Sequence, residues 1–355
     1  MKHVFVYTFL LINIVAAVAI GVASLSVFIS PATFWIPALF GIAYPYLMVV
    51  NLAFIVFWIF IKPKFTILSL LVILAGFNHI GNYLQFSGKH TNDKGVRITT
   101  YNVRYFVGNT QIPIKENADH ILRFLREDNA DIICLQEVRL NKAQIFDINN
   151  TQLPHVAHMQ IAHNGDAGGL LTMTSFPIIK MEEIRFENSG NMIMYADIVM
   201  NTSDTIRVYN CHLQSYKLGE AEIQSIDSLE FNTQPKTKKK VRELGHKFKI
   251  ALVKRAHQAE TLRRSIDKSP YPVIVCGDFN DTPVSYTYHT VKGNLKDSFT
   301  ESGKGTANTY NGKLPSFRID YILYSPIFTS FNFEVSNLNH SDHFPVSCDL
   351  FPAGK

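Results

Sequence analysis

The chain has 355 residues with a formal net charge of +5, and 47% of its residues are hydrophobic. This length leaves room for more than one domain. The charge is unevenly distributed, because residues 1–92 contain four of the 34 basic residues and no Asp or Glu. The remainder therefore carries 30 basic and 29 acidic residues. This near-neutral balance argues against a strongly cationic nucleic-acid-binding protein.

Three apolar runs without charge fill the first part of the chain, at about 4–28, 34–61 and 66–86. A helix needs about 20 apolar residues to cross a hydrocarbon core of roughly 30 Å. The runs lack the polar face of a soluble core helix, so we predict three transmembrane helices in a membrane domain, 1–88, that lies in a lipid bilayer. The alternative for the first run is a cleaved signal peptide, since Ala17-Val18-Ala19 resembles a cleavage site. The run continues apolar past that point, which favours the helix.

Lysines at the ends of these runs indicate the orientation. Lys2, Lys62 and Lys64 favour the cytoplasm, although the basic residues that follow the third run offset them locally. Because early charges usually dominate and three spans are expected, we predict an integral membrane protein whose C-terminal domain lies on the exterior side.

A polar linker, 89–96, leads into a second domain, 97–355. Segments rich in β-branched residues predict strands at 96–103, 131–135, 205–213, 273–276 and 317–323, with helices within 118–128 and 215–269. Strands outnumber helices and do not alternate strictly with them, so we expect two packed sheets flanked by helices. The four cysteines each lie in an apolar run and are expected to be small buried hydrophobes.

A basic stretch, 236–264, holds eleven Lys and Arg residues and two acids. It is either a solvated helical face or a patch that contacts anionic lipid headgroups or a polyanionic substrate.

Polar residues that can carry chemistry lie at or near the ends of the expected strands. Gly277 ends an apolar strand and is followed by Asp278 and Asn280, and similar positions hold other acids, amides and imidazoles. Carboxylate and amide oxygens suit Mg²⁺ or Mn²⁺, and imidazoles beside them suit metal-assisted attack of water on a phosphate ester. The full set is Asn102, Glu137, His212, Asp278, Asn280, Asp320, Asp342 and His343.

These positions fall within short motifs that occur in one order along the chain. The motifs are Tyr101-Asn102-Val103, Leu135-Gln136-Glu137-Val138, Asn210-Cys211-His212-Leu213, Gly277-Asp278-Phe279-Asn280, Arg318-Ile319-Asp320-Tyr321 and Ser341-Asp342-His343-Phe344-Pro345. In this, residues 97 to 351 resemble the endonuclease/exonuclease/phosphatase superfamily of DNase I-like proteins. The resemblance implies an α/β fold, a four-layer α/β/β/α sandwich, and divalent-metal-dependent hydrolysis of a phosphoester.

The resemblance also implies a role for each residue. Glu137 is expected to be the main Mg²⁺ (or Mn²⁺) ligand, with Asn102 and Asp342. Asp278 is expected to orient or deprotonate the attacking water, although the family leaves the identity of the base open.

The resemblance implies that the remaining residues contact the substrate or orient a residue that does. Asn280 and His212 are expected to contact the scissile phosphate, and Asp320 to pair with His343. Arg104, Arg139 and Asn210 are expected to contact substrate; Arg104 stands where some members have an Asp.

The substrate stays open between a phospholipid or other envelope phosphoester, a nucleic acid and an inositol phosphate. A hypothesis of another class is a membrane-bound, non-catalytic module that binds a phosphate ligand. No protein partner is predicted.

Overall fold

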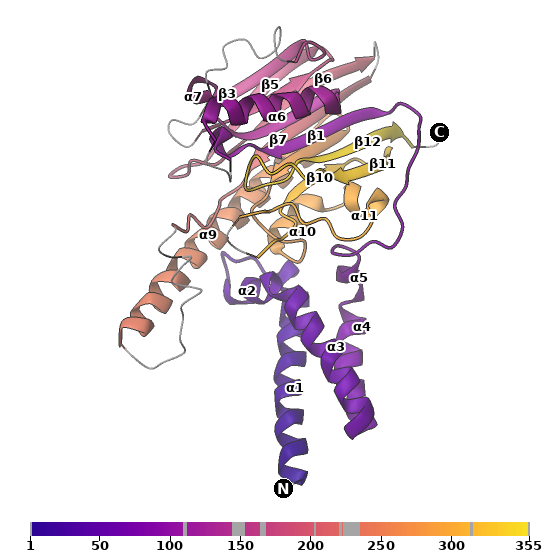
Figure 1. Ribbon diagram of the computed structural model, residues 1–355, viewed down its shortest axis with the longest axis vertical. Helices are drawn as coiled ribbons and strands as arrows, with labels where there is room; N and C mark the ends of the chain where they lie inside the picture. The colour runs from indigo at the N-terminus through magenta and orange to yellow at the C-terminus, as the bar shows by residue number, and fades with distance from the viewer. Residues whose placement is uncertain are drawn as a thin grey trace.

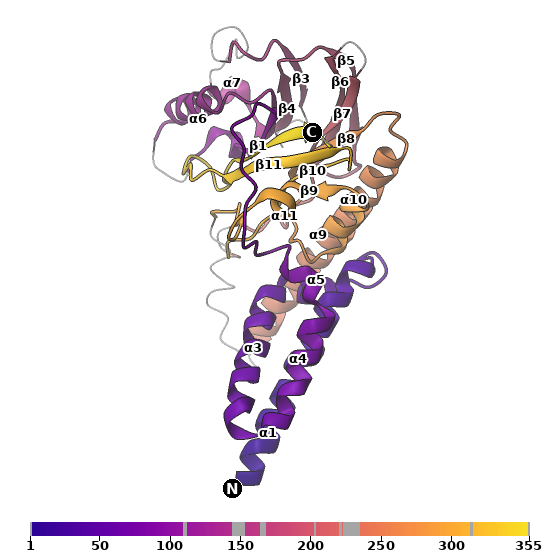
Figure 2. The same ribbon diagram turned by 90° about the vertical axis from the view of Figure 1, so that its right-hand side faces the viewer.

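The structure is a computed structural model that describes residues 2–108, 112–143, 153–163, 168–201, 204–219, 222, 235–312 and 315–353. In this part of the chain, two six-stranded sheets form the upper body of the molecule and a bundle of apolar helices hangs below them (Figures 1 and 2).

The first sheet has the strand order β11-β12-β1-β2-β4-β3. Only β1 and β2 run parallel, and the other neighbours are antiparallel. Its strands are β1 (Val96–Asn102), β2 (Ile132–Val138), β3 (His158–His163), β4 (Gly169–Thr174), β11 (Phe328–Val335) and β12 (Val346–Pro352).

The second sheet has the order β5-β6-β7-β8-β10-β9, again with one parallel pair, β7 and β8. Its strands are β5 (Ile178–Arg185), β6 (Met192–Asn201), β7 (Asp204–His212), β8 (Val273–Asp278), β9 (Lys296–Asp297) and β10 (Asp320–Tyr324). In each parallel pair the carboxyl ends meet at one edge, which brings Asn102 next to Gln136 and His212 next to Asp278.

Three apolar cores separate four layers. Alternate residues of β2 face opposite ways: Ile133 and Leu135 pack under helix α6 (Ile114–Asp128), whereas Ile132 and Cys134 pack against the other sheet. A third core joins the second sheet to α9 (Pro235–Asp267) and α10 (Tyr286–Lys292). Two short helices, α7 (Leu140–Ala143) and α11 (Ser298–Ser302), complete this domain. The predicted α/β/β/α sandwich is confirmed, and all four cysteines are free and buried as expected.

The N-terminal region contains α1 (Lys2–Leu25), α2 (Ile36–Ile42), α3 (Tyr44–Ile61), α4 (Thr66–Ala75) and α5 (Phe77–Ile80). Among the described residues, two helices are long and apolar enough to cross a membrane, His3–Phe28 and Tyr44–Ile61. The prediction of three such helices is therefore wrong. The third apolar run gives only the shorter helix Pro63–Ala75, because it is interrupted at Gly76, and α5 beyond it is four residues long.

A buried polar network joins α1, α3 and α4. Asn13 Nδ2 donates to Ser69 Oγ at 2.7 Å, Ser69 Oγ donates to Asn51 Oδ1 at 3.0 Å, and Trp58 Nε1 donates to Asn13 Oδ1 at 2.8 Å. All four side chains are fully buried, whereas large apolar side chains such as Phe60 point outward. The bundle therefore buries these polar side chains in its interior and exposes large apolar ones on its surface.

The bundle is packed directly on the sandwich. A Cβ at Gly41 would lie 2.4 Å from the carbonyl oxygen of Val284, so this close approach requires glycine. Arg318 Nη2 donates to the Asn82 carbonyl at 3.0 Å, and Gln85 and Gly305 exchange two backbone hydrogen bonds. The predicted linker, 89–96, has no regular secondary structure before β1 and is hydrogen-bonded to the domain at Ser302 and Asn332.

Candidate active site

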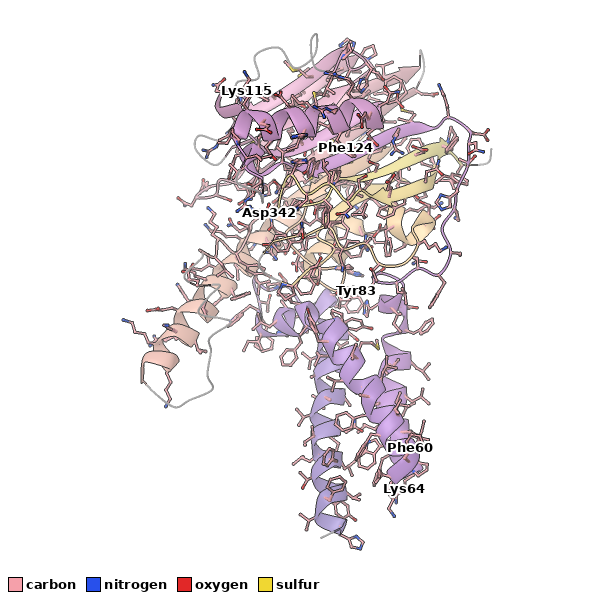
Figure 3. All side chains as sticks on the ribbon, in the orientation of Figure 1. Phe60, Lys64, Tyr83, Lys115, Phe124 and Asp342 are labelled. Carbon is pink, nitrogen blue, oxygen red and sulfur yellow. The ribbon has the colours of Figure 1, made fainter. Side chains whose placement is uncertain are left out.

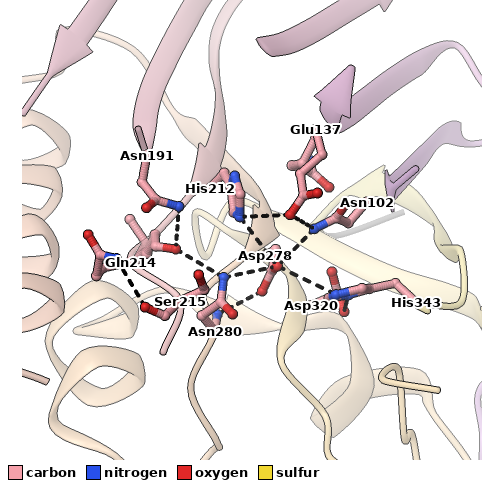
Figure 4. A network of polar contacts seen from close by, with 12 residues as sticks. Asn102, Glu137, Asn191, His212, Gln214, Ser215, Asp278, Asn280, Asp320 and His343 are labelled. Atoms are coloured by element: carbon pink, nitrogen blue, oxygen red, sulfur yellow. Dashed lines mark hydrogen bonds and ion pairs between the residues drawn. The ribbon is translucent and has the colours of Figure 1, made fainter. Parts of the chain in front are cut away.

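Asp278, at the end of β8, lies at the centre of a buried polar cluster (Figure 4). Its Oδ2 accepts from Asn102 Nδ2 at 3.0 Å and from Asn280 Nδ2 at 3.1 Å, and its Oδ1 accepts from the Asn280 backbone N–H at 2.7 Å. Burial raises the pKa of this carboxyl to about 6, although nearby imidazoles pull the pKa down. Asp278 is thus held in one orientation as an acceptor.

Gly277 allows Asp278 to reach this position. Its φ of +131° is unfavourable for other residues, and an added Cβ would lie 2.0 Å from the carbonyl oxygen of Cys211 on the neighbouring strand β7. The glycine therefore lets β7 and β8 approach closely where both strands end in functional side chains.

His343 faces Asp278 from the loop before β12. Its Nδ1 lies 2.9 Å from Asp320 Oδ2 and its Nε2 lies 3.7 Å from Asp278 Oδ2. Burial lowers the pKa of this imidazole, but the carboxylates of Asp320 and Asp278 outweigh burial and raise it to about 10. His343 is therefore a cation at neutral pH, with Nδ1–H donating to Asp320.

His212, at the end of β7, completes the cluster from the other side. Its Nε2 lies 3.5 Å from Glu137 Oε1 and 3.8 Å from Asp278 Oδ2, and it has no hydrogen-bond partner among the described residues. Burial lowers the pKa of this imidazole, so it is neutral where His343 is charged.

Glu137 enters the cluster from β2, and Asn102 Nδ2 donates to its Oε1 at 3.3 Å. Burial raises the pKa of Glu137, and the negative charge of Asp342 raises it further against the opposing effect of His343. The carboxylates of Glu137 and Asp342 therefore repel each other, and the charge of His343 offsets part of this repulsion.

A family model described as the endonuclease/exonuclease/phosphatase family matches residues 99–343, which is more than half of the chain and includes every residue of this cluster. The chain belongs to this family. A second model, described as a domain of unknown function, matches residues 6–83. The boundary between the two matches agrees with the division into bundle and sandwich.

Solved structures of similar fold include two with TM-scores of 0.51. Truncated Caenorhabditis elegans TDP2 is 17% identical, with 72% of this chain and 97% of that chain covered. The human nocturnin catalytic domain with a bound sulfate anion is 18% identical, with 74% of this chain and 97% of that chain covered. At these identities the likeness shows the fold alone. A comparison with the curated proteins finds no match.

The endonuclease/exonuclease/phosphatase family implies a divalent metal, and the donor set fits one. Glu137 and Asp342 supply hard carboxylate oxygens whose mutual repulsion a cation would relieve. Asn102 turns its amide nitrogen toward Glu137 and Asp278, while its Oδ1 accepts from the Arg104 backbone N–H at 3.1 Å. Its predicted role as a ligand therefore requires the amide to turn over.

A second group, Asp278, Asp320 and His343, also has ligand atoms within 4.8 Å of one another. We assign the metal to Glu137 and Asp342 and not to this group, because His343 Nδ1 and Asp320 Oδ2 already bond to each other at 2.9 Å. This group fits proton handling and orientation.

The two predicted arginines lie beside the cluster. Arg104 Nε is 3.4 Å from Asp342 Oδ2, and the Arg139 guanidinium lies 4.4 Å from the centre of the Tyr105 ring. Burial, and then the charge of Glu137, raise the pKa of Tyr105 to about 12, so its hydroxyl remains protonated beside that carboxylate.

Asn210 is not part of the cluster. It is fully buried between the two sheets, where its Oδ1 accepts from Gln136 Nε2 at 2.8 Å and its Nδ2 donates to the carbonyls of Leu135 and Leu171, both at 3.1 Å. Its amide is used in joining the sheets, so we no longer propose a substrate contact there.

Sequence reasoning assigned no role to Ser341 or Tyr105. Ser341 Oγ donates to the Asn102 carbonyl at 2.7 Å and accepts from the His343 backbone N–H at 3.3 Å, which ties the loop of His343 to β1. The only signal in the sequence was the position of Ser341 directly before Asp342.

A cavity of about 480 Å³ opens over the cluster. Its polar side is lined by Glu137, Asp278, Asn280, Asp342 and His343.

Proposed function

We propose that this protein hydrolyses a phosphoester with the help of a divalent cation, Mg²⁺ or Mn²⁺, while anchored in a membrane. The observation that carries the proposal is the geometry around Asp278, whose oriented carboxylate has a charged imidazole 3.7 Å away on one side and a neutral one 3.8 Å away on the other. Family membership supports the same class of reaction.

Asp278, His343 and Asp320 each have a separate role in the proposed reaction. Asp278, ionised above its pKa of about 6, accepts a proton from the attacking water. His343 presents positive charge to the phosphoryl oxygens as negative charge develops on them, and Asp320 keeps the ring oriented and protonated.

We expect His212 Nε2, which has no hydrogen-bond partner among the described residues, to bind another phosphoryl oxygen. Asn280 Nδ2 already donates to Asp278 Oδ2 and to the Leu213 carbonyl at 3.0 Å, so we expect Asn280 to orient Asp278 and no longer propose a phosphate contact for it. A cation held by Glu137 and Asp342, with Asn102 turned over, would supply Lewis-acid polarisation of the phosphoryl group.

The bundle supports membrane anchoring. Its polar side chains Asn13, Asn51 and Ser69 are buried and its outer surface is apolar, which is the reverse of a helix at the surface of a soluble protein. α1 also continues unbroken through the region that resembles a cleavage site, and Ala17 is 2% exposed. Lys64 lies with the N-terminus at the end of the bundle remote from the sandwich (Figure 3), which favours an exterior catalytic domain.

The test uses the full chain in detergent with methyl p-nitrophenyl phosphate, a soluble phosphodiester. We expect hydrolysis in Mg²⁺ or Mn²⁺ that stops in EDTA. Glu137→Gln and His343→Asn should each lower kcat by at least about 100-fold.

Matched controls are Glu243→Gln and His257→Asn, which change the same residue types at side chains that are 63% and 62% exposed on α9. Both should retain activity. Activity that survives Glu137→Gln and His343→Asn would refute the assignment. Phosphate binding without any hydrolysis would favour the non-catalytic module.

A further inference from the structure

Besides the catalytic carboxylates, the cavity has a group of apolar lining residues, called the apolar wall here, and part of this wall comes from the N-terminal bundle. Leu39 and Ile42 of α2 and Tyr46 of α3 line it together with Leu218, Phe248 and Phe317. The rings of Tyr46 and Phe317 are 6.4 Å apart, so the bundle and the sandwich meet at this wall. An inositol phosphate has no apolar group that such a wall would recognise, whereas a nucleotide base would stack on its aromatic rings, so the test below includes a nucleic acid.

The bundle holds its side of the wall in a fixed position. Gly41 packs against the carbonyl of Val284, and Tyr44 Oη donates to the Gly76 carbonyl at 3.0 Å. Val284 also belongs to a core shared with Ile20 and Val27 of the N-terminal segment. The apolar wall is therefore built into the site, and it does not depend on a flexible tether.

An apolar stripe leads away from the cavity along α3. Tyr46, Val49, Val50, Val56 and Phe60 recur at helical spacing on one face, and each is between 42% and 81% exposed. From Tyr46 to Phe60 the stripe is about 21 Å long at about 1.5 Å per residue, which exceeds half of a hydrocarbon core of roughly 30 Å. Figure 3 places Phe60 at the far end of α3 and Asp342 in the sandwich above the bundle.

We propose that the substrate is a lipid phosphoester that enters from the bilayer, with its phosphate at Asp278 and His343 and its apolar chain on the wall and along α3. This rests on the proposed function and names its substrate class. Water oxygen forms a new bond to phosphorus, the phosphorus–oxygen bond to the leaving alcohol breaks, and the leaving oxygen takes a proton. The same reaction applies to either of the two ester bonds of a phosphodiester.

The test compares methyl p-nitrophenyl phosphate with hexadecyl p-nitrophenyl phosphate, which share the reacting phosphorus and the leaving group and differ only in the chain. The full protein in detergent with Mg²⁺ should show a higher kcat/KM for the hexadecyl ester. Tyr46→Ser should lower the hexadecyl-to-methyl ratio about tenfold, equal to about 1.4 kcal/mol.

Leu71→Ser is the matched control, because Leu71 is 61% exposed on another helix of the bundle, α4, and does not line the cavity. It should leave the ratio unchanged, which separates recognition by the wall from simple partition of the long ester into micelles.

Three outcomes overturn the inference while leaving phosphoester hydrolysis standing. They are equal kcat/KM for the two esters, an equal ratio in Tyr46→Ser and Leu71→Ser, and a preference for a labelled DNA oligonucleotide over the hexadecyl ester. Failure of the wild-type protein to hydrolyse either ester overturns the proposed function itself.

Discussion

Asn210→Ala removes a side chain whose amide joins the two sheets, so we expect stability to fall while the folded protein keeps its affinity for substrate. Four hydrogen bonds are lost, to Gln136 Nε2, to the Leu135 and Leu171 carbonyls, and to Thr172 Oγ1 at 3.3 Å. All lie in the core between the sheets, where water cannot replace the lost partner.

The size of the effect follows from which partners are left unsatisfied. Gln136 Nε2 keeps two other acceptors, Thr100 Oγ1 at 3.0 Å and the Cys134 carbonyl at 3.1 Å, so its loss is small. The buried acceptors that lose a donor each contribute about 1–3 kcal/mol. We expect a total of about 3 kcal/mol, and a fall in Tm of roughly 6–12 °C for a domain of this size.

The assay is thermal unfolding of the full chain in detergent, followed by the KM of each variant for methyl p-nitrophenyl phosphate at a temperature where both remain folded. Asn294→Ala, at an exposed loop position, is the control and should leave Tm unchanged. An unchanged Tm with a raised KM in Asn210→Ala would refute the structural role and restore the predicted substrate contact.

Three further predictions concern the site, the fold and the topology. Asp320→Asn removes a carboxylate that raises the pKa of His343, so the loss of kcat/KM at high pH, expected near pH 10 in the wild type, should move down by at least about one pH unit; an unchanged profile would show that His343 does not act as a cation. Gly277→Ala should cost more than about 3 kcal/mol of stability, because its Cβ would meet the Cys211 carbonyl, whereas Gly305→Ala, with a φ of +72° and nothing within 4 Å, should cost only about 1 kcal/mol; similar Tm losses would contradict this. An impermeant maleimide should label Lys94→Cys and spare Lys64→Cys in intact cells, since all native cysteines are buried, and the reverse pattern would invert the topology.

Strand ends could be predicted from the sequence because buried strands have a strong apolar pattern. The distance of a residue from the end of its strand could not be predicted in this way. Asn210 and His212 face the same side of β7, as their spacing predicts, but Asn210 pairs with Cys276 in the sheet interior and His212 pairs with Asp278 at the edge. The two residues are only two positions apart along β7, yet this difference makes Asn210 a structural residue and His212 a residue of the site.

The contact between Asp278 and Asn280 comes from a turn and not from strand alternation. Alternation places residues two apart on the same side of a strand, but β8 ends at Asp278 and Asn280 has a φ of +53°. The two side chains meet because the Asn280 backbone N–H bonds to Asp278 Oδ1 in a turn. The part of the cavity wall that comes from α2 and α3 could not be predicted at all, since nothing local to 36–61 indicates which surface of the sandwich it contacts.

Backbone strain explains why Glu137 reaches the site. Alternation along β2 places Leu135 under α6 and Gln136 against the other sheet, so Glu137 would be expected on the α6 side. The register of β2 with β4 shifts between Leu135 and Val138, and Glu137 adopts a φ of +55°, which is unfavourable for a residue with a side chain.

Further residues with positive φ lie beside the same cluster, namely Arg104, Tyr105 and Asn280. Each such conformation costs on the order of 1–3 kcal/mol and persists only where the surrounding structure enforces it. Their concentration around Asp278 indicates that the sandwich gives up stability to aim these groups into one cavity. Sequence periodicity reflects regular, unstrained backbone. It could therefore locate the strands, but it could not predict that the Glu137 carboxylate turns away from the regular alternation of β2.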